Sequence, residues 1–263
     1  MSHHHIHGGP IWGKVDIGEG KTMTCLQVLY RNSRAMVSFA RPDQLRVILK
    51  TVGARVVLDN GAFSKWMKAK KQQEVIDWGK YWTDYYLFVM TYISLIDWFI
   101  VPDVIEGTEE ENDKLINSIP SALKHKAVPV WHSNESLDKL VRLCLEFDIV
   151  AIGCCGKEAV IRSKSWSTRM DDAFKEIYIN RKIDVKIHGL RMLDGRVMIQ
   201  YPFDSCDSTN VAINVPKDKA RYPEVKCKLA RTAVLKGAIE QVKPPTIEQW
   251  VKSFKYEDQL DLF

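Results

Sequence analysis

The amino-acid sequence predicts an α/β protein built as a single-domain (β/α)8 barrel of the TIM type. Short β-branched apolar runs alternate along the chain with longer amphipathic stretches, which is the pattern of βα units around a parallel sheet. The chain has 263 residues and is 46% hydrophobic, so it can bury one large core. A doubly wound open sheet is the structural alternative, but no Gly-x-Gly-x-x-Gly or Walker sequence follows any apolar run.

The apolar runs are predicted to be strands, and the amphipathic stretches are predicted to be helices. The expected strands are Thr24–Tyr30, Ala35–Phe39, Arg55–Leu58, Trp98–Val101, Ala127–Trp131, Ile149–Ile152, Val185–His188 and Val197–Tyr201. One helix opens at Pro42, and others are expected over Gln73–Tyr86, Thr108–Ile119, Ser136–Phe147, Ser165–Asn180, Arg231–Gln241 and Thr246–Phe254. Residues 1–240 would form the barrel, and residues 241–263 a C-terminal helix and tail.

Composition and cysteine spacing favour a cytoplasmic protein. The 38 basic and 33 acidic residues give a net charge of +5, a modest excess that suits a polyanionic partner without requiring one. No two of the six cysteines are spaced Cys-x-x-Cys, so we expect reduced thiols and no structural zinc. The most apolar run, Tyr85–Val101, is interrupted by Asp97, and we therefore predict no membrane span.

Histidines near the start of the chain invite a metal interpretation, because His5 and His7 alternate as ligands on a strand can. A frayed or tag-like terminus, or a first barrel strand ending at Gly8-Gly9-Pro10, would explain them equally well. No carboxylate or further histidine nearby completes a ligand set. We therefore expect no metal and no other cofactor.

Polar residues follow the predicted strands. They are Asp59-Asn60-Gly61-Ala62-Phe63-Ser64, Pro102-Asp103, His132-Ser133, Gly153-Cys154-Cys155-Gly156, His188-Gly189-Leu190-Arg191 and residues 202–210. An acid after a strand is often only the N-cap of the next helix. In a parallel barrel, however, the strand ends meet at one rim, where the chemistry of such folds takes place. Several carboxylates at one mouth favour nucleophilic or acid/base work at a sugar carbon, because they stabilise an oxocarbenium-like transition state and shift each other's pKa.

These segments resemble, in the same order, short motifs of the tRNA-guanine transglycosylase family and of its phage and bacterial DNA-guanine transglycosylase relatives. The resemblance runs from Asp59 to Asn210. Asp59-Asn60-Gly61-Ala62-Phe63 is similar to the family's Asp-Ser-Gly-Gly/Ser-Phe, which implies that Asp59 transfers a proton and places the base. His132 stands where the family has a base-contacting glutamine. The residues implied to bind substrate are Asn60, Gly61, Phe63, Asp103, His132, Gly153, His188 and Gly189.

The nucleophile of this family is an aspartate followed by Ser or Cys, and both Asp204-Ser205 and Asp207-Ser208 match that pattern. Asp207 is favoured, because Asp207-Ser208-Thr209 is similar to the form in phage-type members. Asp204 would then be a neighbour that tunes it. The family's zinc motif is absent from the sequence, as is the RNA-binding domain of archaeal members. These departures favour DNA over tRNA as the substrate.

The C-terminal pentapeptide Gln259-Leu260-Asp261-Leu262-Phe263 resembles the peptide that binds the bacterial sliding clamp. A few apolar anchors buried in preformed pockets carry most of the energy of such a contact. A tail that folds back onto the barrel is the alternative. The resemblance implies the clamp as a partner, DNA as the substrate, and a phage-encoded protein that works in a bacterial host cell.

Basic residues near the nucleophile segment are candidate phosphate contacts, namely Arg191, Arg196, Lys217, Lys219 and Arg221. A second group could contact phosphates or form a solvated helix face, namely Lys65, Lys68, Lys70 and Lys71.

The expected function is exchange of guanine in DNA for a 7-deazaguanine, such as 7-cyano-7-deazaguanine, through a covalent aspartyl-glycosyl intermediate. Three alternatives remain open. They are tRNA-guanine exchange, a metal-dependent barrel hydrolase built on His5, His7, His132 and His188, and a non-catalytic clamp-associated module that binds DNA.

Overall fold

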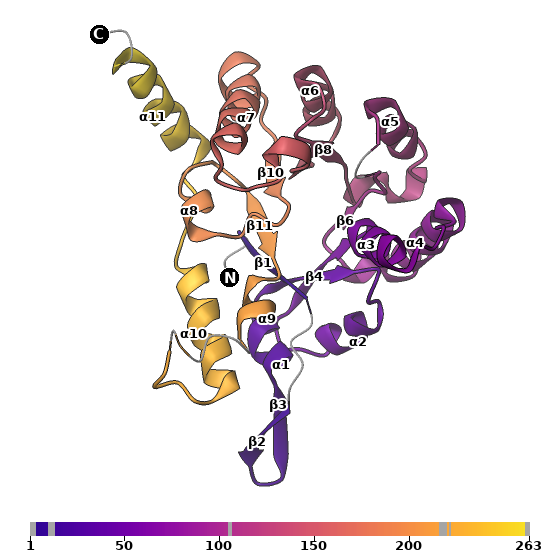
Figure 1. The fold of residues 1–263 in the computed structure, drawn as a ribbon, viewed down its shortest axis with the longest axis vertical. Coiled ribbons are helices and arrows are strands. Elements are labelled where there is room, and N and C mark those ends of the chain that lie inside the picture. The colour runs from indigo at the N-terminus through magenta and orange to yellow at the C-terminus, as the bar shows by residue number, and fades with distance from the viewer. Residues whose placement is uncertain (1–3, 10–13, 105–106, 216–219, 221, 261–263) are drawn as a thin grey trace.

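Nine parallel strands form the main sheet of the computed structural model, which describes residues 4–9, 14–104, 107–215, 220 and 222–260 (Figure 1). Along the sheet the order is β7-β6-β5-β4-β1-β11-β10-β9-β8. The strands are β1 (His5–Gly8), β4 (Arg34–Ser38), β5 (Arg55–Asp59), β6 (Phe99–Ile100), β7 (Ala127–Val128), β8 (Val130–His132), β9 (Ile149–Gly153), β10 (Lys186–Gly189) and β11 (Ser205–Ser208).

The two ends of this order lie in one stretch of chain. Only Pro129 separates β7, which pairs with β6, from β8, which pairs with β9. Proline has no amide N–H to donate, so it interrupts the ladder, yet its carbonyl still accepts from the backbone N of Ala151 at 2.9 Å. The sheet is therefore nearly closed and barrel-like, as expected for a TIM-type architecture.

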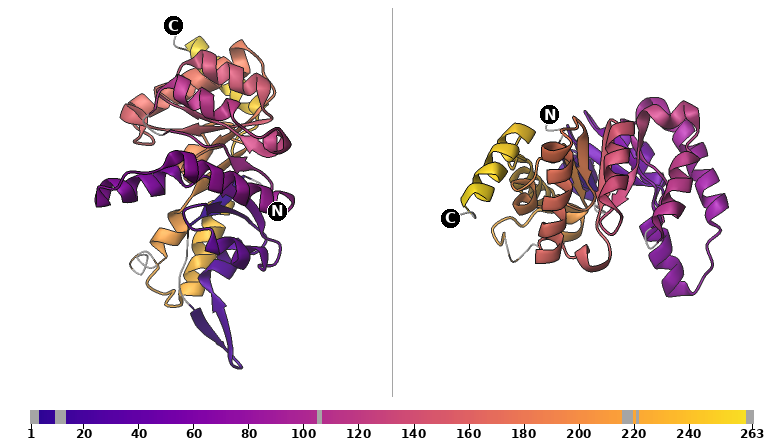
Figure 2. Two further views of the ribbon diagram at one scale, coloured as in Figure 1. Left: turned by 90° about the vertical axis from the view of Figure 1, so that its right-hand side faces the viewer. Right: turned by 90° about the horizontal axis from the view of Figure 1, so that it is seen from above.

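Helices follow the strands and cover the outside of the sheet (Figures 1 and 2). The α-helices are α1 (Cys25–Tyr30), α2 (Asp43–Leu49), α3 (Ala62–Gln72), α4 (Trp78–Tyr92), α5 (Glu109–Asn117), α6 (Leu137–Glu146), α7 (Lys164–Phe174), α8 (Gly195–Met198), α9 (Asn210–Asn214), α10 (Lys228–Glu240) and α11 (Ile247–Leu260). Short 3-10 turns are η1 (Ile93–Leu95), η2 (Ser121–Lys126) and η3 (Gly156–Glu158), and η4 (Lys175–Asn180) extends α7 as a π-helix. An antiparallel hairpin, β2 (Lys14–Gly18) with β3 (Lys21–Thr24), projects from the body.

Two cores result from the alternation of side chains along each strand. A smaller core fills the inside of the barrel and consists of Ile6, Met36, Val57, Trp98, Ile100, Val128, Val130 and Ala151. A larger core lies between the outer face of the sheet and the helices, with Trp131, Trp166 and Phe174 among its largest buried side chains. Inward and outward positions are thus fixed along every strand.

The parallel α/β architecture is confirmed, as are the predicted strands from Ala35–Phe39 to Val185–His188. Two strand predictions are wrong. Thr24–Tyr30 forms helix α1, because Thr24 and Gln27 make a capping box, with Thr24 Oγ1 accepting from the Gln27 amide at 3.1 Å and Gln27 Oε1 accepting from the Thr24 amide at 2.8 Å. Val197–Tyr201 contains the end of α8, which Asp194 caps by accepting from the Arg196 amide at 2.9 Å.

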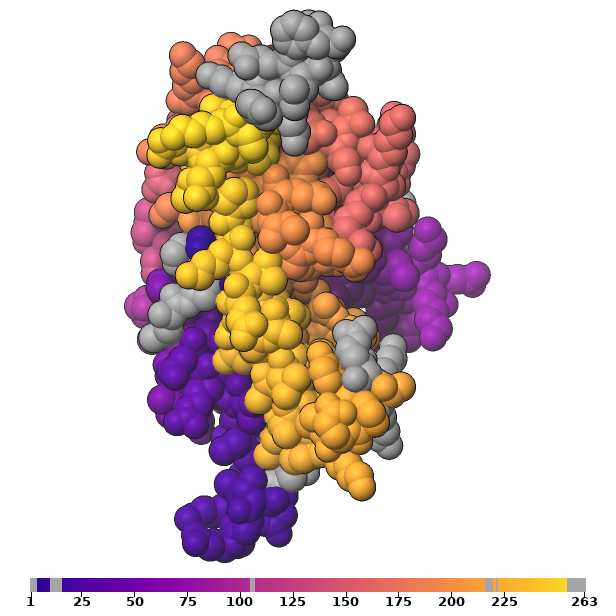
Figure 3. Space-filling model, turned by 90° about the vertical axis from the view of Figure 1, so that its left-hand side faces the viewer, coloured from indigo at the N-terminus to yellow at the C-terminus, as the bar shows by residue number. Residues whose placement is uncertain are grey.

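Most helix predictions match the structure. The predicted helix Gln73–Tyr86 is wrong at its start, because α4 begins at Trp78. Asp77 is its N-cap, and the Asp77 side chain accepts from the Lys80 amide. At the C-terminal end, α10 and α11 follow one another along one side of the molecule (Figures 1 and 3). Helix α11 lies next to α7, and Trp250 packs against Phe174 with ring centroids 5.9 Å apart. None of the helices in the described residues has the length and apolarity needed to cross a membrane.

Candidate active site

Three carboxylates gather at the carboxyl ends of the strands, and we call Asp59, Asp103 and Asp207 the carboxylate ring. Asp59 is the last residue of β5 and pairs in register with Ser38. Asp207 lies in β11 and pairs with Ile6, whose side chain belongs to the core inside the barrel. Paired residues of parallel strands point to the same side of a sheet. Asp207 therefore faces the barrel interior.

Asp59 has a raised pKa. Burial, together with the negative charges of Asp207 and Asp103, raises the pKa of its carboxyl to about 6. A hydrogen bond with Ser38 and the charge of Arg191 oppose that rise. A carboxyl with a pKa near 6 can both give and take a proton close to neutral pH. The carboxylates also lie close enough to act on one another, as one active site requires.

Gly61 shapes the turn that carries Asp59. Its φ of 76° is left-handed, and a Cβ at this position would lie 2.6 Å from the backbone N of Ala40 and 2.7 Å from the hydroxyl of Tyr81. Only glycine fits such a close approach. The turn also aims Asn60, whose Nδ2 donates to Asp103 Oδ1 at 2.7 Å. Gly61 therefore shapes the turn after Asp59, and Asn60 fixes the position of Asp103.

Asp207 is held by groups that follow β10. Its Oδ1 accepts from the backbone N of Arg191 at 2.9 Å and lies 3.3 Å from His188 Nε2. The His188 ring is fixed by Ser205 Oγ, 2.9 Å from Nδ1, and by an edge contact with Trp98. Both contacts to Asp207 reach Oδ1. Among the described residues, no hydrogen bond or ion pair reaches Oδ2.

Arg191 and Phe63 form a stacked pair beside the ring. The Arg191 guanidinium carbon lies 3.6 Å from the centroid of the Phe63 ring, a close cation–π contact. Arg191 has a left-handed φ of 61°, a conformation that costs free energy in any residue other than glycine. That backbone turns its amide toward Asp207 and its side chain toward Phe63.

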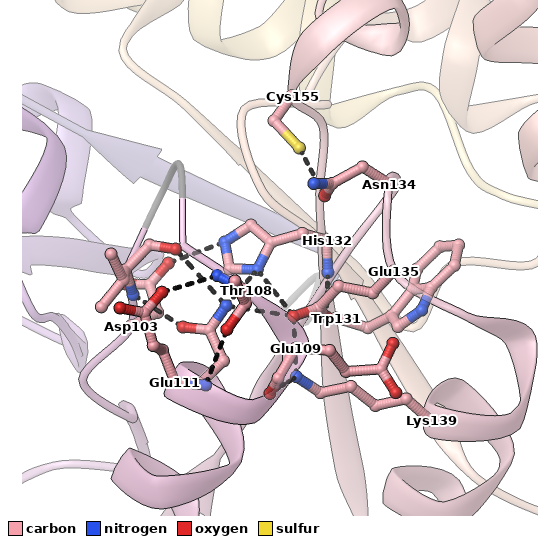
Figure 4. Close-up of polar contacts among 12 residues, drawn as sticks. Asp103, Thr108, Glu109, Glu111, Trp131, His132, Asn134, Glu135, Lys139 and Cys155 are labelled. Carbon is pink, nitrogen blue, oxygen red and sulfur yellow. Dashed lines mark hydrogen bonds and ion pairs between the residues drawn. The ribbon is translucent and has the colours of Figure 1, made fainter.

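Asp103 belongs to a buried network with His132, Glu135 and Lys139 (Figure 4). The His132 Nε2–H donates to Asp103 Oδ2 at 2.9 Å, and Glu135 Oε2 accepts from the backbone N of His132 at 2.9 Å. The Lys139 ammonium donates to Glu135 Oε1 at 2.7 Å. Burial alone would lower the pKa of His132, but its hydrogen bonds to Asp103 and Glu135 outweigh that effect and raise it to about 10.

The glycines expected to line the base differ in their surroundings. A Cβ on Gly153 would lie 3.1 Å from Val130 Cγ1 and 3.5 Å from His132 Cδ2, so Gly153 adjoins the inside of the ring. A Cβ on Gly189 would instead meet Met192 and Cys206, which belong to the outer core. The structure therefore does not bring Gly189 to the carboxylates.

Asp204 is placed at the amino end of β11, away from the ring. Its backbone N donates to Ile187 O, its carbonyl lies 2.7 Å from His4 Nδ1, and its charge acts on Arg34 at the start of β4. Residues three apart in an extended strand are separated by about 10 Å. The structure therefore brings Asp207, and not Asp204, to Asp59.

His5 and His7 face outward from β1. His5 Nε2 lies 2.7 Å from the carbonyl of Val242, and His7 Nε2 lies 3.1 Å from Glu240 Oε1. They do not join His132 or His188, and the described residues contain no group of three or more His, Cys, Asp or Glu side chains that could hold a metal ion.

The basic residues predicted to contact phosphates lie in different parts of the molecule. Arg191 lies beside the ring, whereas Arg196 is exposed on α8, with its nearest guanidinium nitrogens 3.4 Å from Asp194. The predictions for Lys217, Lys219 and Arg221 fall outside the described residues, as do those for Asp261, Leu262 and Phe263. Gln259 and Leu260 are the last residues of α11. The second group of lysines, Lys65, Lys68, Lys70 and Lys71, lies on α3, directly after Phe63.

Two hollows in the described part of the molecule lie away from the ring. One of about 140 Å³ lies between α8, α9 and α10, and one of about 350 Å³ lies where Trp98, Lys126 and Phe147 meet at the amino ends of β6, β7 and β9. None of the three carboxylates lines either hollow.

Several residues of the site were missed from the sequence. Ser38 ends β4 as Asp59 ends β5, and it lies within the predicted strand Ala35–Phe39, so its place near the rim was readable. Glu135 and Lys139 stand four residues apart across the start of a predicted helix, a spacing that commonly pairs charges.

No family model matches this sequence, and no curated protein matches it either.

Proposed function

We propose that this protein exchanges guanine in DNA for a 7-deazaguanine, with Asp207 as nucleophile and Asp59 as acid and base, on a (β/α)8 barrel that lacks the zinc site of the family it resembles. The observation that carries the proposal is the pair of unlike carboxylates at one mouth. Asp59 holds a proton up to about pH 6. Asp207 Oδ1, in contrast, accepts from the backbone N of Arg191 and lies 3.3 Å from His188 Nε2. Such a pair suits cleavage of a glycosidic bond.

In the first half-reaction, Asp207 Oδ2 attacks C1′ of a deoxyguanosine. The bond from C1′ to N9 breaks, its electron pair goes to the departing guanine, and Asp59 supplies the proton. The product is a glycosyl ester on Asp207. In the second half-reaction, the incoming 7-deazaguanine gives its N9 proton to Asp59, and N9 attacks C1′. The ester bond breaks, which regenerates the Asp207 carboxylate. The exchange needs no oxidant, reductant or cofactor.

The rest of the site supports placement of a flat base. Asp103, His132 and Gly153 adjoin one another on the side of the ring opposite Asp207 in strand order, where they are proposed to meet the purine edge. Phe63 and Arg191 offer a stacking surface and a cation near the phosphates. A guanine in duplex DNA must be flipped out or met in a single strand, and binding of the C-terminal pentapeptide to the sliding clamp is proposed to supply such DNA.

Incubation of the protein with labelled guanine and either DNA or tRNA tests the substrate. We expect label in DNA, and more in single-stranded than in duplex DNA. Label that enters tRNA alone would refute the choice of DNA and favour the tRNA exchanger.

Trapping of the intermediate tests the nucleophile, and the chain offers a matched control. Asp207→Asn should abolish both exchange and any denaturation-resistant adduct with DNA. Asp204→Asn changes the same side chain three residues away at the other end of β11, and it should retain exchange. Loss of the adduct in Asp204→Asn with retention in Asp207→Asn would reverse the assignment.

A further inference from the structure

A chain of buried charges leads from the carboxylate ring into the layer between α5 and α6 (Figure 4). The side chains of His132, Glu135 and Lys139 are 6%, 2% and 0% exposed. His132 Nε2 lies 2.9 Å from Asp103 Oδ2, and its Nδ1 lies 3.7 Å from Glu135 Oε1. Lys139 Nζ lies 2.7 Å from the same Glu135 oxygen. Both ring nitrogens of His132 therefore face carboxylates.

Asn112 lies next to His132 Nδ1 but is engaged by other groups. Its Nδ2 lies 3.4 Å from Nδ1, but the two amide hydrogens already have better acceptors, Glu135 Oε1 at 3.0 Å and the carbonyl of Val104 at 3.3 Å. Its Oδ1 accepts from the Val104 amide at 2.7 Å, which fixes the orientation of the side chain. Nδ1 therefore needs no donor from Asn112, and its own proton can point to Glu135.

The charges alternate in sign along the chain, in the order Asp103, His132, Glu135, Lys139. Buried charges are tolerated when opposite charges neighbour them. If His132 were neutral, two buried carboxylates would face a single ammonium. Other charged groups lie around this chain: Asp113 is 3.4 Å from Lys139 Nζ, Glu109 caps α6 at Ser136, and Arg169 donates to the carbonyls of Ser133 and Glu135. Asp113 also pairs with Arg142, so Lys139 keeps Glu135 as its closest partner.

We propose that Glu135 and Lys139 are positioning residues that hold His132 as a fixed imidazolium beside Asp103 and thereby set which purine the site accepts. Lys139 anchors Glu135, Glu135 fixes both the backbone N and the ring of His132, and His132 presents its Nε2–H next to an Asp103 acceptor. In keeping with this arrangement, burial would raise the pKa of Glu135, but hydrogen bonds from the ring and backbone of His132 and from Lys139 lower it to about 2.

The consequence for base choice rests on the proposed function. A bound base would share the Nε2–H with Asp103 Oδ2, and a donor beside a carboxylate acceptor matches an edge that offers a carbonyl oxygen next to N–H groups, as 2-amino-6-oxopurines do. A neutral imidazole could present a lone pair instead and accept an exocyclic amine, which would admit adenine. A fixed charge removes that option, because an imidazolium has donors only. The network would thus exclude 6-aminopurines at every pH at which His132 stays charged.

Nitrogen NMR of the full chain labelled at its histidines tests the charge directly. The His132 signals are assigned by their loss in His132→Gln. We expect the ring to remain doubly protonated from about pH 6 to about pH 8.5, far above the ordinary histidine pKa of about 6.5. Glu135→Gln should lower its midpoint by at least about one pH unit, whereas Lys139→Met should leave it unchanged or raise it, because Glu135 then acts on His132 alone.

Opposite shifts of the His132 midpoint in these two variants distinguish control by charge from control by packing. Damage to the fold would shift both midpoints in the same direction. The double variant Glu135→Gln with Lys139→Met keeps the pair neutral and should also lower the midpoint, which covers failure of a single variant to fold. Glu240→Gln is the matched control, because Glu240 joins His7 and Lys236 in a similar chain on β1 and α10, away from the strand β8 that carries His132, and the His132 titration should not change.

Titration of His132 near its ordinary value in the unaltered protein, or shifts of the same sign in both single variants, would overturn the proposal. Exchange assays supply the second measurement. With guanine as substrate, Glu135→Gln should show a KM that rises with pH while that of the unaltered protein stays flat. If His132 is charged but no base exchange occurs with any nucleic acid, the proposed function fails and the charge network remains.

Discussion

Replacement of Asp59 by asparagine should stabilise the fold while it abolishes exchange. A rise of the Asp59 pKa from 3.8 to about 6 is worth about 3 kcal/mol, at about 1.4 kcal/mol per pH unit. Asparagine is uncharged and escapes that cost. Asparagine accepts more weakly than a carboxylate from Ser38 and from the Gly61 amide, which lies 3.2 Å from Asp59 Oδ2. These weaker hydrogen bonds offset about 1 to 2 kcal/mol of the gain. A net gain of about 1 to 2 kcal/mol at neutral pH and above remains.

The gain has a defined pH dependence. Because the pKa of Asp59 is higher in the folded than in the unfolded chain, the native carboxyl contributes its stability fully below about pH 3.8 and loses it as the pH rises through about 6. Asp59→Asn should therefore match the unaltered protein near pH 4 and exceed it near pH 8. Urea unfolding followed by tryptophan fluorescence at both pH values measures the difference.

Asp84→Asn is the control, because Asp84 is an exposed carboxylate that pairs with Lys80 on α4. Its effect should stay within about 0.5 kcal/mol at either pH. A gain for Asp59→Asn that is equal at both pH values would show that charge is not its source. A loss of stability near pH 8 would refute the electrostatic description of the site.

Four further changes have expected outcomes. Gly61→Ala should cost at least about 2 kcal/mol in thermal unfolding, since it meets backbone at 2.6 Å in a left-handed conformation. Arg231→Met should cost about 3 kcal/mol, because the buried guanidinium donates to three backbone carbonyls that would lose their partners. Glu135→Gln should flatten acid unfolding, because the lowered pKa of Glu135 gives stability that is present above about pH 4.5 and lost as the pH falls toward 2. Arg191→Ala should weaken binding of single-stranded DNA and reduce its dependence on salt, as measured by fluorescence anisotropy.

The sequence pattern predicted the parts of the fold where burial follows hydrophobicity. Strands such as Arg55–Asp59 and Ile149–Gly153 are apolar runs with a polar residue or a glycine at the end, and both the strand and the rim position were readable. The same reasoning placed Asp59, Asp103 and His132 at the carboxyl rim. Because parallel strands share one direction, residues far apart in sequence could be expected to meet there.

The two strands of the main sheet that are absent from the eight predicted strands are those made of polar residues. β11 is Ser-Cys-Asp-Ser, and its inward positions are filled by Ser205 and Asp207, which serve the site and do not build the core. β1 contains His5 and His7, whose outward side chains are satisfied by a carbonyl and a carboxylate from the region of α10. Hydrophobic periodicity does not detect such strands, because their side chains make hydrogen bonds and do not build the core. The choice between Asp204 and Asp207 was open for that reason, since β11 shows no apolar alternation.

The distribution of hydrogen-bond donors explains why the pKa of Asp59 is raised. Three negative charges at one rim repel one another, and Asp59 has few donors that compensate its charge. Asp103 receives the Asn60 amide and a charged His132, and Asp207 receives the Arg191 amide with His188 nearby. Among the described residues, Asp59 has a serine hydroxyl and one long amide contact. A variant that removes the serine donor, such as Ser38→Ala, should therefore raise the pH at which Asp59 titrates; an unchanged Asp59 midpoint in carbon NMR of the side-chain carboxyls would break this link.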